Sequence, residues 1–396
     1  MTKPADFHRE IPRRGTGCVK YDALLANYGR DDLEPLWVAD MDFASPEAVT
    51  EALRRRVDHP VYGYAVTPDS FYQEIARWLH RRHGFDVGPQ EICYVPGVVR
   101  GIALALMHFT SAGDTVVIQP PVYHPFRRLV EGNGRRCVTN PLVLTEDAAG
   151  NPRYEMDLDG LERVVAAERP RMLILCNPHN PSGRQWDADT LRRVAQICRR
   201  AGVVVVSDEI HGDLMNDGRR HIPFATVSDD AAAVAVTFGA PSKTFNIPGL
   251  VSSWVVVPNR ALREPFYQWL EVNEFSSPTF LAADGAEAAY AHGEEWLDAV
   301  LQYIGENIAA VEQAFAERLP QVKVMHPDAS YLIWIDFRAL GFDQAELNRR
   351  MVDVAGVALN PGDMFGTEGT GFMRLNAGMP RRRLLDAVGR IIDACR

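Results

Sequence analysis

The sequence predicts an α/β fold in which a largely parallel β-sheet carries helices on both faces. Apolar runs of strand length recur at residues 115–119, 172–176, 203–207, 234–238 and 251–257. Segments with helical periodicity, such as residues 187–201, separate them, and strands that alternate with helices usually pair in parallel. Four consecutive valines at 203–206 support this interpretation, because a parallel strand buried on both faces is apolar at every position.

Chain length predicts two domains. The chain has 396 residues, whereas single hydrophobic cores stop growing at about 250–300 residues. Residues 294–319 place apolar side chains at helical spacing, which predicts a long amphipathic helix that bridges the domains. A strand at 331–337 is expected in the smaller α/β domain. We expect residues 46–290 to form the large domain, and residues 1–45 and 291–396 to form a small domain that is discontinuous in sequence.

Charge and hydropathy argue against several partners. The formal net charge of −10 disfavours nucleic acid, because neutralising phosphates needs clustered Lys and Arg. The arginine clusters at 54–56 and 381–383 fall on expected helices and predict solvated faces. Residues 1–10 lack the apolar core of a secretion signal, and no apolar run approaches the ~20 residues of a membrane helix. We therefore expect no membrane partner and a cytoplasmic location.

Cysteine and histidine spacing predicts no metal site. Six cysteines are scattered without CxxC or zinc-like pairing, at Cys18, Cys93, Cys137, Cys176, Cys198 and Cys395. In so long a chain they are typical of free thiols in a reducing compartment. His80 and His83 lie three residues apart on an expected helix but have no third ligand, so we predict two surface histidines.

Lys243 lies in the most informative segment, residues 242–250, just after an apolar run at 231–238 that predicts a buried strand. A buried lysine loses its charge readily because desolvation disfavours the ammonium form. The neutral amine can then attack an aldehyde and form a Schiff base. A lone lysine in a loop is more often a solvated charge, so this interpretation depends on the segments upstream.

Two acids, Asp208 and Glu209, follow the valine run directly. They are expected at the carboxyl end of a parallel strand, where open α/β sheets place their ligands. An acid there can hold a pyridine nitrogen protonated, which turns pyridoxal phosphate into an electron sink. For an isolated pair, a helix N-cap or a metal carboxylate is the simpler alternative.

Two further turns accompany these segments. Asn180 lies between two Asn-Pro pairs and Gly183, in a tight loop that holds its amide in place; the simpler alternative is a turn without function. The sequence Gly97-Val98-Val99 opens an apolar helix, and the free N–H groups at a helix start bind phosphate. Many helices start this way, so residues 97–99 alone are weak evidence for a phosphate site. The order of the four segments along the chain is what supports it.

Together these segments resemble pyridoxal-phosphate enzymes of the aspartate-aminotransferase type, from about Phe7 to the C-terminus. The resemblance implies fold type I, in which a mostly parallel seven-stranded sheet lies between helices in a large cofactor-binding domain. Within that superfamily the chain resembles the MalY/PatB-type C–S lyases, also called cystathionine β-lyases. The resemblance to this subgroup is carried by residues 35–43, 63–64, 208–211, 242–246, 293–298 and 372–376.

The resemblance implies a role for each matching residue. Lys243 forms the Schiff base and moves the Cα proton, Asp208 pairs with the pyridine nitrogen, and Asn180 donates to the ring oxygen O3′. Tyr123 stacks on the cofactor ring and is a second catalytic candidate. The phosphate is expected to contact Gly97, Val98, Val99, Ser242 and, from the neighbouring subunit, Tyr64.

The substrate side of the site follows from the same resemblance. Arg374 is expected to hold the α-carboxylate in a bidentate pair, close to the backbone of Ala39 and Asp40 and to Asn180. Because Tyr64 serves the other protomer, the resemblance implies a homodimer with a shared site.

Three positions depart from the aminotransferase pattern. Val251 stands where many aminotransferases carry a phosphate-binding arginine, and Ala240 stands where a phosphate-binding serine is frequent. His211, expected beside the cofactor, replaces a common tyrosine, as it does in the lyase group. The first two departures remove phosphate donors, so Ser242 and Tyr64 are expected to carry more of that contact.

The predicted activity is β-elimination from L-cystathionine or a related L-cysteine S-conjugate, which gives a thiol, pyruvate and ammonia. An amino acid aminotransferase is the alternative, because it shares the early steps. A third possibility is a lyase scaffold with an added regulatory role through a protein partner. Retention of Lys243, Asp208, Asn180 and Arg374 argues against a purely non-catalytic protein.

Overall fold

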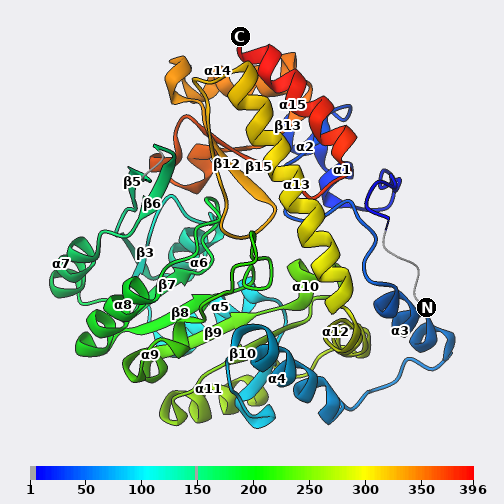
Figure 1. Cartoon of the computed structure of the whole chain (residues 1–396). Coiled ribbons are helices and arrows are strands. Elements are labelled where there is room, and N and C mark those ends of the chain that lie inside the picture. Colours follow the sequence, from blue (N-terminus) through cyan, green and yellow to red (C-terminus); the bar gives the residue numbers. More distant parts are fainter. Residues whose placement is uncertain (1–5, 148–149) are drawn as a thin grey trace.

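The computed structural model describes residues 6–147 and 150–396, and a seven-stranded sheet forms its centre (Figure 1). The strand order is β2 (Ile92–Val95), β10 (Ser253–Val256), β9 (Ala235–Gly239), β8 (Val204–Asp208), β7 (Met172–Cys176), β3 (Thr115–Ile118) and β4 (Arg136–Thr139). β10 is antiparallel to both neighbours, and the other neighbouring pairs are parallel. The prediction of a largely parallel sheet is confirmed.

Helices cover both faces of this sheet. Val205 and Val206 of β8 lie in two different clusters of buried apolar side chains, because successive side chains of a strand point to opposite faces. The Val206 cluster includes residues of α5 (Val98–Phe109), α6 (Pro125–Gly132) and α11 (Arg260–Val272). The Val205 cluster includes residues of α4 (Asp69–His83), α7 (Leu158–Glu168), α8 (Ala188–Ala201) and α12 (Phe280–His292).

One predicted strand boundary is wrong. Residues 231–238 do not form a single strand, because the first of them belong to α9 (Asp229–Val234). The Ser228 hydroxyl accepts a hydrogen bond from the Ala231 N–H, and two aspartates occupy the first turn. This capping and the run of alanines favour a helix, so β9 begins only at Ala235.

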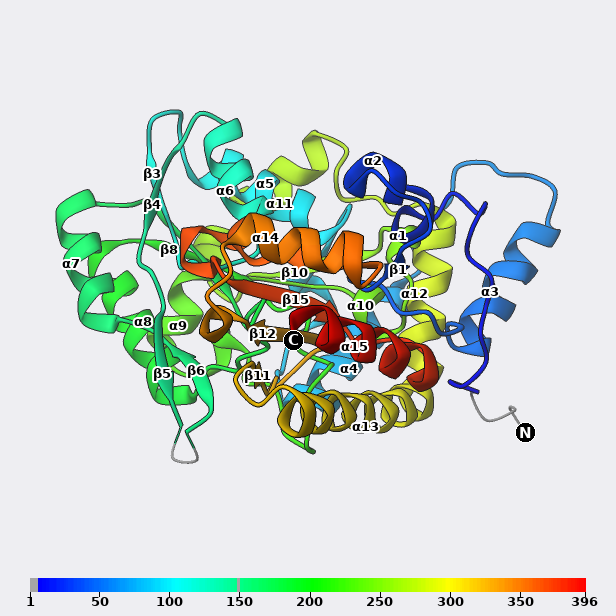
Figure 2. The ribbon, with the colours of Figure 1, turned by 90° about the horizontal axis from the view of Figure 1, so that it is seen from above.

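A second, antiparallel sheet lies beside the first. Its strand order is β11 (Lys323–Met325), β12 (Leu332–Asp336), β15 (Phe372–Asn376) and β14 (Asn360–Pro361). The long helix predicted at 294–319 is confirmed as α13 (Glu294–Arg318), which runs from α12 to α15 (Arg381–Cys395) (Figure 1). Figure 2 shows α13, α14 (Gln344–Arg349) and α15 arranged around β12 and β15.

The N-terminal segment runs along this second sheet (Figure 2). It contains α1 (Val19–Asp22), α2 (Leu24–Tyr28) and β1 (Glu34–Pro35), and β1 pairs in parallel with β13 (Val357–Ala358). The chain then passes through residues 37–45 to α3 (Glu47–Asp58). The predicted solvated face at 381–383 is wrong for Arg383, because its guanidinium pairs with Glu34 of this segment. The remaining strands, β5 (Val143–Glu146) and β6 (Pro152–Glu155), form a hairpin.

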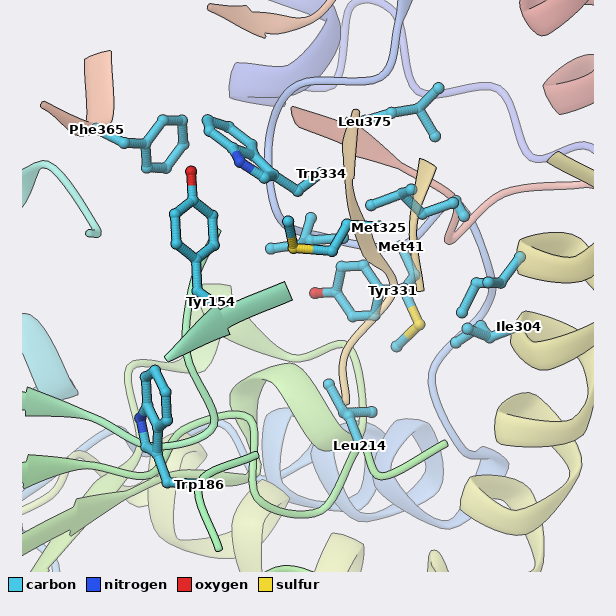
Figure 3. Close-up of a cluster of buried hydrophobic side chains, with 14 of the residues drawn as sticks. Met41, Tyr154, Trp186, Leu214, Ile304, Met325, Tyr331, Trp334, Phe365 and Leu375 are labelled. Atoms are coloured by element: carbon cyan, nitrogen blue, oxygen red, sulfur yellow. The ribbon is translucent and has the colours of Figure 1, made fainter. Parts of the chain in front are cut away.

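Apolar packing continues from one sheet to the other. Figure 3 shows Trp186 and Leu214 near the seven-stranded sheet, and Met325, Trp334 and Leu375 near the antiparallel sheet. All of these side chains belong to one cluster of buried residues, so the edge of the first sheet and the second sheet share a hydrophobic core. In residues 6–147 and 150–396, no helix combines the length and apolar character needed to cross a membrane.

Candidate active site

The candidate site is a cavity of about 230 Å³ where β7, β8 and β9 end and α5 begins. Parallel strands bring their carboxyl ends to one edge, so residues far apart in sequence meet there. The lining includes most of the predicted site residues: Ala39, Gly97, Val98, Val99, Tyr123, Asn180, Asp208, His211, Ser242 and Lys243. A larger and more open hollow of about 770 Å³ lies between α4 and α13, but arginines along it are already paired with acids.

Lys243 lies on the single turn α10 (Pro241–Thr244), directly after β9. Its Nζ donates a hydrogen bond of 2.5 Å to the Ala39 carbonyl oxygen. Burial lowers the pKa of Lys243 to about 8, and Arg374 adds to this effect while Asp40 and Asp208 oppose it. A substantial fraction of the amine is therefore neutral near physiological pH.

The turn that carries Lys243 is anchored by a buried acid, Asp213. The Thr244 hydroxyl donates to Asp213 at 2.7 Å, and the Trp78 indole N–H donates to the same carboxylate at 2.8 Å. His83 Nε2 lies 2.7 Å from Asp213 as well. The prediction that His83 is a surface histidine is therefore wrong, because its side chain is only 8% exposed, whereas His80 is exposed as predicted.

Asp208 and Glu209 have different surroundings although they are adjacent. Asp208 ends β8 and lines the cavity, where burial raises its pKa to about 7 and the charge of Glu209 adds to the increase. Glu209 faces away: its carboxylate accepts from Ser207 and from the Phe224 N–H and lies 2.8 Å from His221. Only Asp208 is placed to meet a ligand in the cavity.

Arg374, on β15, reaches the site from the antiparallel sheet. Its guanidinium donates to Asn180 Oδ1 at 2.9 Å, to Asn360 Oδ1 at 2.6 Å and to the Trp37 carbonyl at 3.0 Å. Burial lowers its pKa to about 10, so the group stays cationic at neutral pH. Its Nε is buried and has no hydrogen-bond partner in the described parts of the chain, which leaves a cation ready for an anionic ligand.

The start of α5 offers an anion site beside these groups. Gly97 adopts φ 99°, which favours glycine, and the N–H groups of Val98 and Val99 have no partner four residues back within the helix. The Gly97 N–H donates to the Val95 carbonyl, so it is not free as expected; phosphate contact through Val98 and Val99 stays a prediction. Val251 faces Gly97 and leaves this wall apolar.

Sequence reasoning missed Arg100, whose side chain lines the cavity one turn into α5. Its guanidinium donates to the Pro96 carbonyl at 3.4 Å, and in the described ranges it forms no ion pair. The signal was visible in the sequence as a basic residue three positions after Gly97. Arg100 places a positive charge near the wall where Val251 stands in place of an arginine.

Aromatic groups complete the cavity. Burial raises the pKa of the Tyr123 phenol, so this group is a neutral hydroxyl. Burial lowers the pKa of His211 to about 3, with help from Lys243 and Arg374, so the imidazole is neutral too. Tyr331 was not predicted, yet its hydroxyl donates to the Ala39 carbonyl at 2.9 Å, the same oxygen that Lys243 contacts.

Three predicted residues do not line the cavity itself: Arg374, Tyr64 and Asp40. Arg374 lies behind the wall and contacts it through Asn180. Tyr64 follows α3 in an extended stretch, and its side chain is fully exposed to solvent in the single chain. Asp40 is turned away from the cavity and forms an ion pair with Arg13 at 2.7 Å. Only the backbone next to Asp40, at Ala39, faces Lys243.

The residues present fit pyridoxal phosphate and an amino acid. The cavity offers a partly neutral amine at Lys243, an acid at Asp208 and backbone donors at the start of α5. These groups match an aldehyde, a pyridine nitrogen and a phosphate in turn. The buried Arg374 Nε without a partner matches a carboxylate.

Comparison with known proteins identifies the family of this chain. Residues 32–391 match the family described as aminotransferase class I and II. The chain therefore belongs to this family, and its seven-stranded sheet with helices on both faces is the fold type I architecture that the sequence predicted.

Individual relatives indicate a narrower group within this family. The chain is 46% identical to "Cystathionine beta-lyase PatB" of Bacillus subtilis over 386 residues, which cover 98% of each chain. Among solved structures it is similar to cystalysin from Treponema denticola, which contains pyridoxal 5′-phosphate (TM-score 0.92, 31% identity, 98% of each chain). It is also similar to the pyridoxal-phosphate-bound C–S lyase from Staphylococcus hominis (TM-score 0.89, 29% identity, 98% of this chain and 97% of the other).

Proposed function

We propose that this chain is a pyridoxal-phosphate-dependent carbon–sulfur β-lyase. It cleaves L-cystathionine or a related L-cysteine S-conjugate into a thiol, pyruvate and ammonia. The full-length similarity to a cystathionine β-lyase carries the proposal. The similarity to cystalysin and to a C–S lyase, both with bound pyridoxal phosphate, supports it. The buried Arg374 guanidinium, whose Nε has no hydrogen-bond partner among the described residues, is the feature of the site that suits an amino acid substrate.

The bound cofactor supplies an electron sink that makes the Cα–H bond of an amino acid acidic. Asp208 would receive the pyridine N–H, Asn180 would donate to the ring oxygen, and Tyr123 would stack on the ring. Val98, Val99, Ser242 and Arg100 would hold the phosphate, and His211 would serve as a neutral donor to the ring. Arg374 binds the substrate carboxylate beside Ala39 and orients the Cα–H bond toward Lys243.

Lys243 then works as the base. Near neutral pH, part of its amine is unprotonated, since its pKa is about 8, and it accepts the Cα proton. The C–S bond breaks as the electron pair leaves with sulfur. The thiolate takes a proton from the Lys243 ammonium or from the Tyr123 hydroxyl, and water later releases pyruvate and ammonia.

An aminotransferase is the second candidate, because the family as a whole carries that name. One assay separates the two: the protein is incubated with L-cystathionine and no 2-oxo acid, and pyruvate and thiol are measured separately. Equal amounts of both products over many turnovers support β-elimination. Turnover that needs a 2-oxo acid acceptor, with no thiol released, would exclude the proposed reaction.

The proposal also covers the assembly of the enzyme, its domains and its location. Two chains form a homodimer in which Tyr64 of each protomer reaches the phosphate of the other; its complete exposure in one chain leaves it free for this contact. Residues 46–290 form the cofactor-binding domain, and residues 1–45 and 291–396 form the small domain. The enzyme works in the cytoplasm, where its six unpaired cysteines remain reduced. Dilution that yields monomers is expected to abolish activity.

A further inference from the structure

Residues 37–41 are held by an unusual set of contacts, because each of their five carbonyl oxygens accepts a hydrogen bond from a side chain. Arg374 donates to Trp37, and Asn376 donates to Val38 and Asp40. Lys243 and Tyr331 donate to Ala39, and Met41 accepts from Asn246 and Arg13. Two of these oxygens, those of Trp37 and Ala39, contact the side chains that are proposed to bind and deprotonate the substrate.

On the side away from the cavity, the same segment is tied to buried charges. The Lys20 side chain is 0% exposed, and its Nζ lies 3.2 Å from Asp42 Oδ2 and donates to the Asp40 carbonyl at 3.2 Å. Arg13 bridges the two acids, at 2.7 Å from Asp40 and 2.6 Å from Asp42. The Tyr21 hydroxyl donates to Asp42 at 2.9 Å.

The charges of Lys20, Arg13, Asp40 and Asp42 balance one another. Lys20 and Arg13 face Asp40 and Asp42, so two cations meet two anions. Burial alone would raise the pKa of Asp42, yet the charges of Lys20 and Arg13 outweigh it and the pKa is lowered. Asp42 is therefore a buried carboxylate, and removing one partner from such a group leaves an uncompensated charge that must move toward water.

No residue of this cluster lines the cavity, but the cluster holds residues 37–41, of which Ala39 does. Asp40 and Asp42 flank Met41 and follow Ala39, whose carbonyl is shared by Lys243 and Tyr331. A shift of residues 37–41 by about 1 Å moves the Trp37 carbonyl that holds the Arg374 guanidinium, and misplacement on this scale weakens the contact of that guanidinium with a substrate carboxylate.

We infer that Lys20 and Asp42 are positioning residues, which hold residues 37–41 so that Arg374 and the Ala39 backbone are ready for the substrate carboxylate. The inference rests on the proposed function for the identity of the substrate, and it concerns amino acid binding rather than cofactor binding. Arg13 supports residues 37–41 from the partly exposed edge of the cluster.

The test compares Asp42→Asn and Lys20→Met with the unaltered holoenzyme. Each variant removes one charge and nearly preserves side-chain shape. We expect KM for L-cystathionine to rise about 10-fold, equivalent to about 1.4 kcal/mol, with kcat changed less than about threefold. The dissociation constant of pyridoxal phosphate, measured by its visible absorbance, is expected to stay at the wild-type value. Arg318→Met and Asp393→Asn are the matched controls, because that ion pair is exposed.

A second readout is independent of turnover. Binding of 2-aminoisobutyrate, an amino acid without a Cα proton, is followed by the absorbance of the bound cofactor, and its affinity is expected to fall by the same factor as KM rises. Wild-type KM and wild-type 2-aminoisobutyrate affinity in both variants would overturn the inference. A joint loss of kcat, cofactor affinity and folded protein would overturn it as well, since that pattern indicates a purely structural role.

A third variant and a separate readout distinguish failure of this inference from misfolding and from failure of the proposed function. If the fully buried variants do not fold, Arg13→Met tests residues 37–41 from the edge of the cluster, with the same expected rise in KM and the same outcomes. Failure of the proposed function is seen separately, as wild-type protein that releases no pyruvate and thiol. In that case 2-aminoisobutyrate binding still decides whether Lys20 and Asp42 position an amino acid site.

Discussion

The two halves of the active site are built by different means. The half formed by Asp208, Asn180 and Lys243 sits on strand ends and tight turns of the seven-stranded sheet, and each side chain lies within a few residues of its strand. The half formed by Trp37 to Met41 and Arg374 has no such local support. It is held by contacts between residues more than 200 positions apart, such as Lys243 with Ala39 and Arg374 with Trp37. The first half follows from where the strands of one sheet end, whereas the second depends on contacts between distant parts of the fold.

The largest effect is expected in the strand-end half. Lys243→Ala removes the only lysine among the described residues that line the cavity, and with it both the attachment to the cofactor and the base. Turnover is expected to fall by about 10⁴-fold or more, and the visible absorbance of the covalently held cofactor is expected to disappear. The control is Lys323→Ala, which alters an exposed lysine on β11. Residual activity above about 1% of wild type would show that another group supplies the base.

Arg374→Lys tests the half that depends on distant contacts. Lysine keeps the charge but loses the planar donors that reach Asn180, Asn360 and Trp37 at once. Losing one partner of a buried charged pair costs about 2–5 kcal/mol, so KM is expected to rise about 100-fold, and kcat less. Steady-state kinetics measure both, with the exposed Arg349→Lys as control. An unchanged KM would mean that the carboxylate binds elsewhere.

Cofactor uptake as a function of pH connects the two halves, because Arg374 belongs to one and Lys243 to the other. Burial places the pKa of Lys243 at about 8, and only the neutral amine attacks an aldehyde. The rate at which the cofactor-free protein takes up pyridoxal phosphate is therefore expected to rise about tenfold per pH unit below 8 and to level off above it. Arg374→Met removes a nearby positive charge that lowers this pKa, so the midpoint is expected to move upward. Stopped-flow absorbance between pH 6.5 and 9.5 measures both midpoints, and a rate independent of pH would contradict the burial argument.

The same contrast explains what could be predicted from the sequence. Apolar runs and the residues just after them placed Asp208, Asn180 and Lys243 in one cavity, because strand ends converge without any knowledge of side-chain contacts. The strand at 231–238 was predicted too long, since a Ser228 cap and a run of alanines turn its beginning into α9.

Long-range contacts were beyond sequence reasoning. Tyr331 and Asn360 reach the site through the antiparallel sheet, and no local pattern marks them. His83 was predicted at the surface because no third metal ligand accompanies it, but Asp213, 130 positions away, holds it inside. Lys20 gave no signal either, since its burial depends on carboxylates from residues 40 and 42 folding back over it.

The smallest expected effect concerns a contact outside the cavity, between the turn after β11, the helix α13 and the turn after β8. His326 follows β11 and lies 2.7 Å from Glu312 of α13 and 2.8 Å from Asp217, in the turn that follows β8 and His211. The hydrogen bond with Glu312 raises the pKa of His326 from 6.5 to about 9, and the contact with the Asp217 carboxylate adds to the increase. Because the folded protein holds this proton more tightly, the stabilisation is complete below pH 6.5 and is lost as the pH rises through 9. The side chain is 41% exposed, so solvent screening limits the contribution to less than about 1 kcal/mol.

His326→Gln is expected to lower the thermal midpoint by about 1 °C at pH 6.5 and to have no effect at pH 10, as measured by calorimetry. A difference that grows with pH would reverse the assigned sign, and a large loss of turnover in this variant would show that the contacts of His326 also matter for the active site.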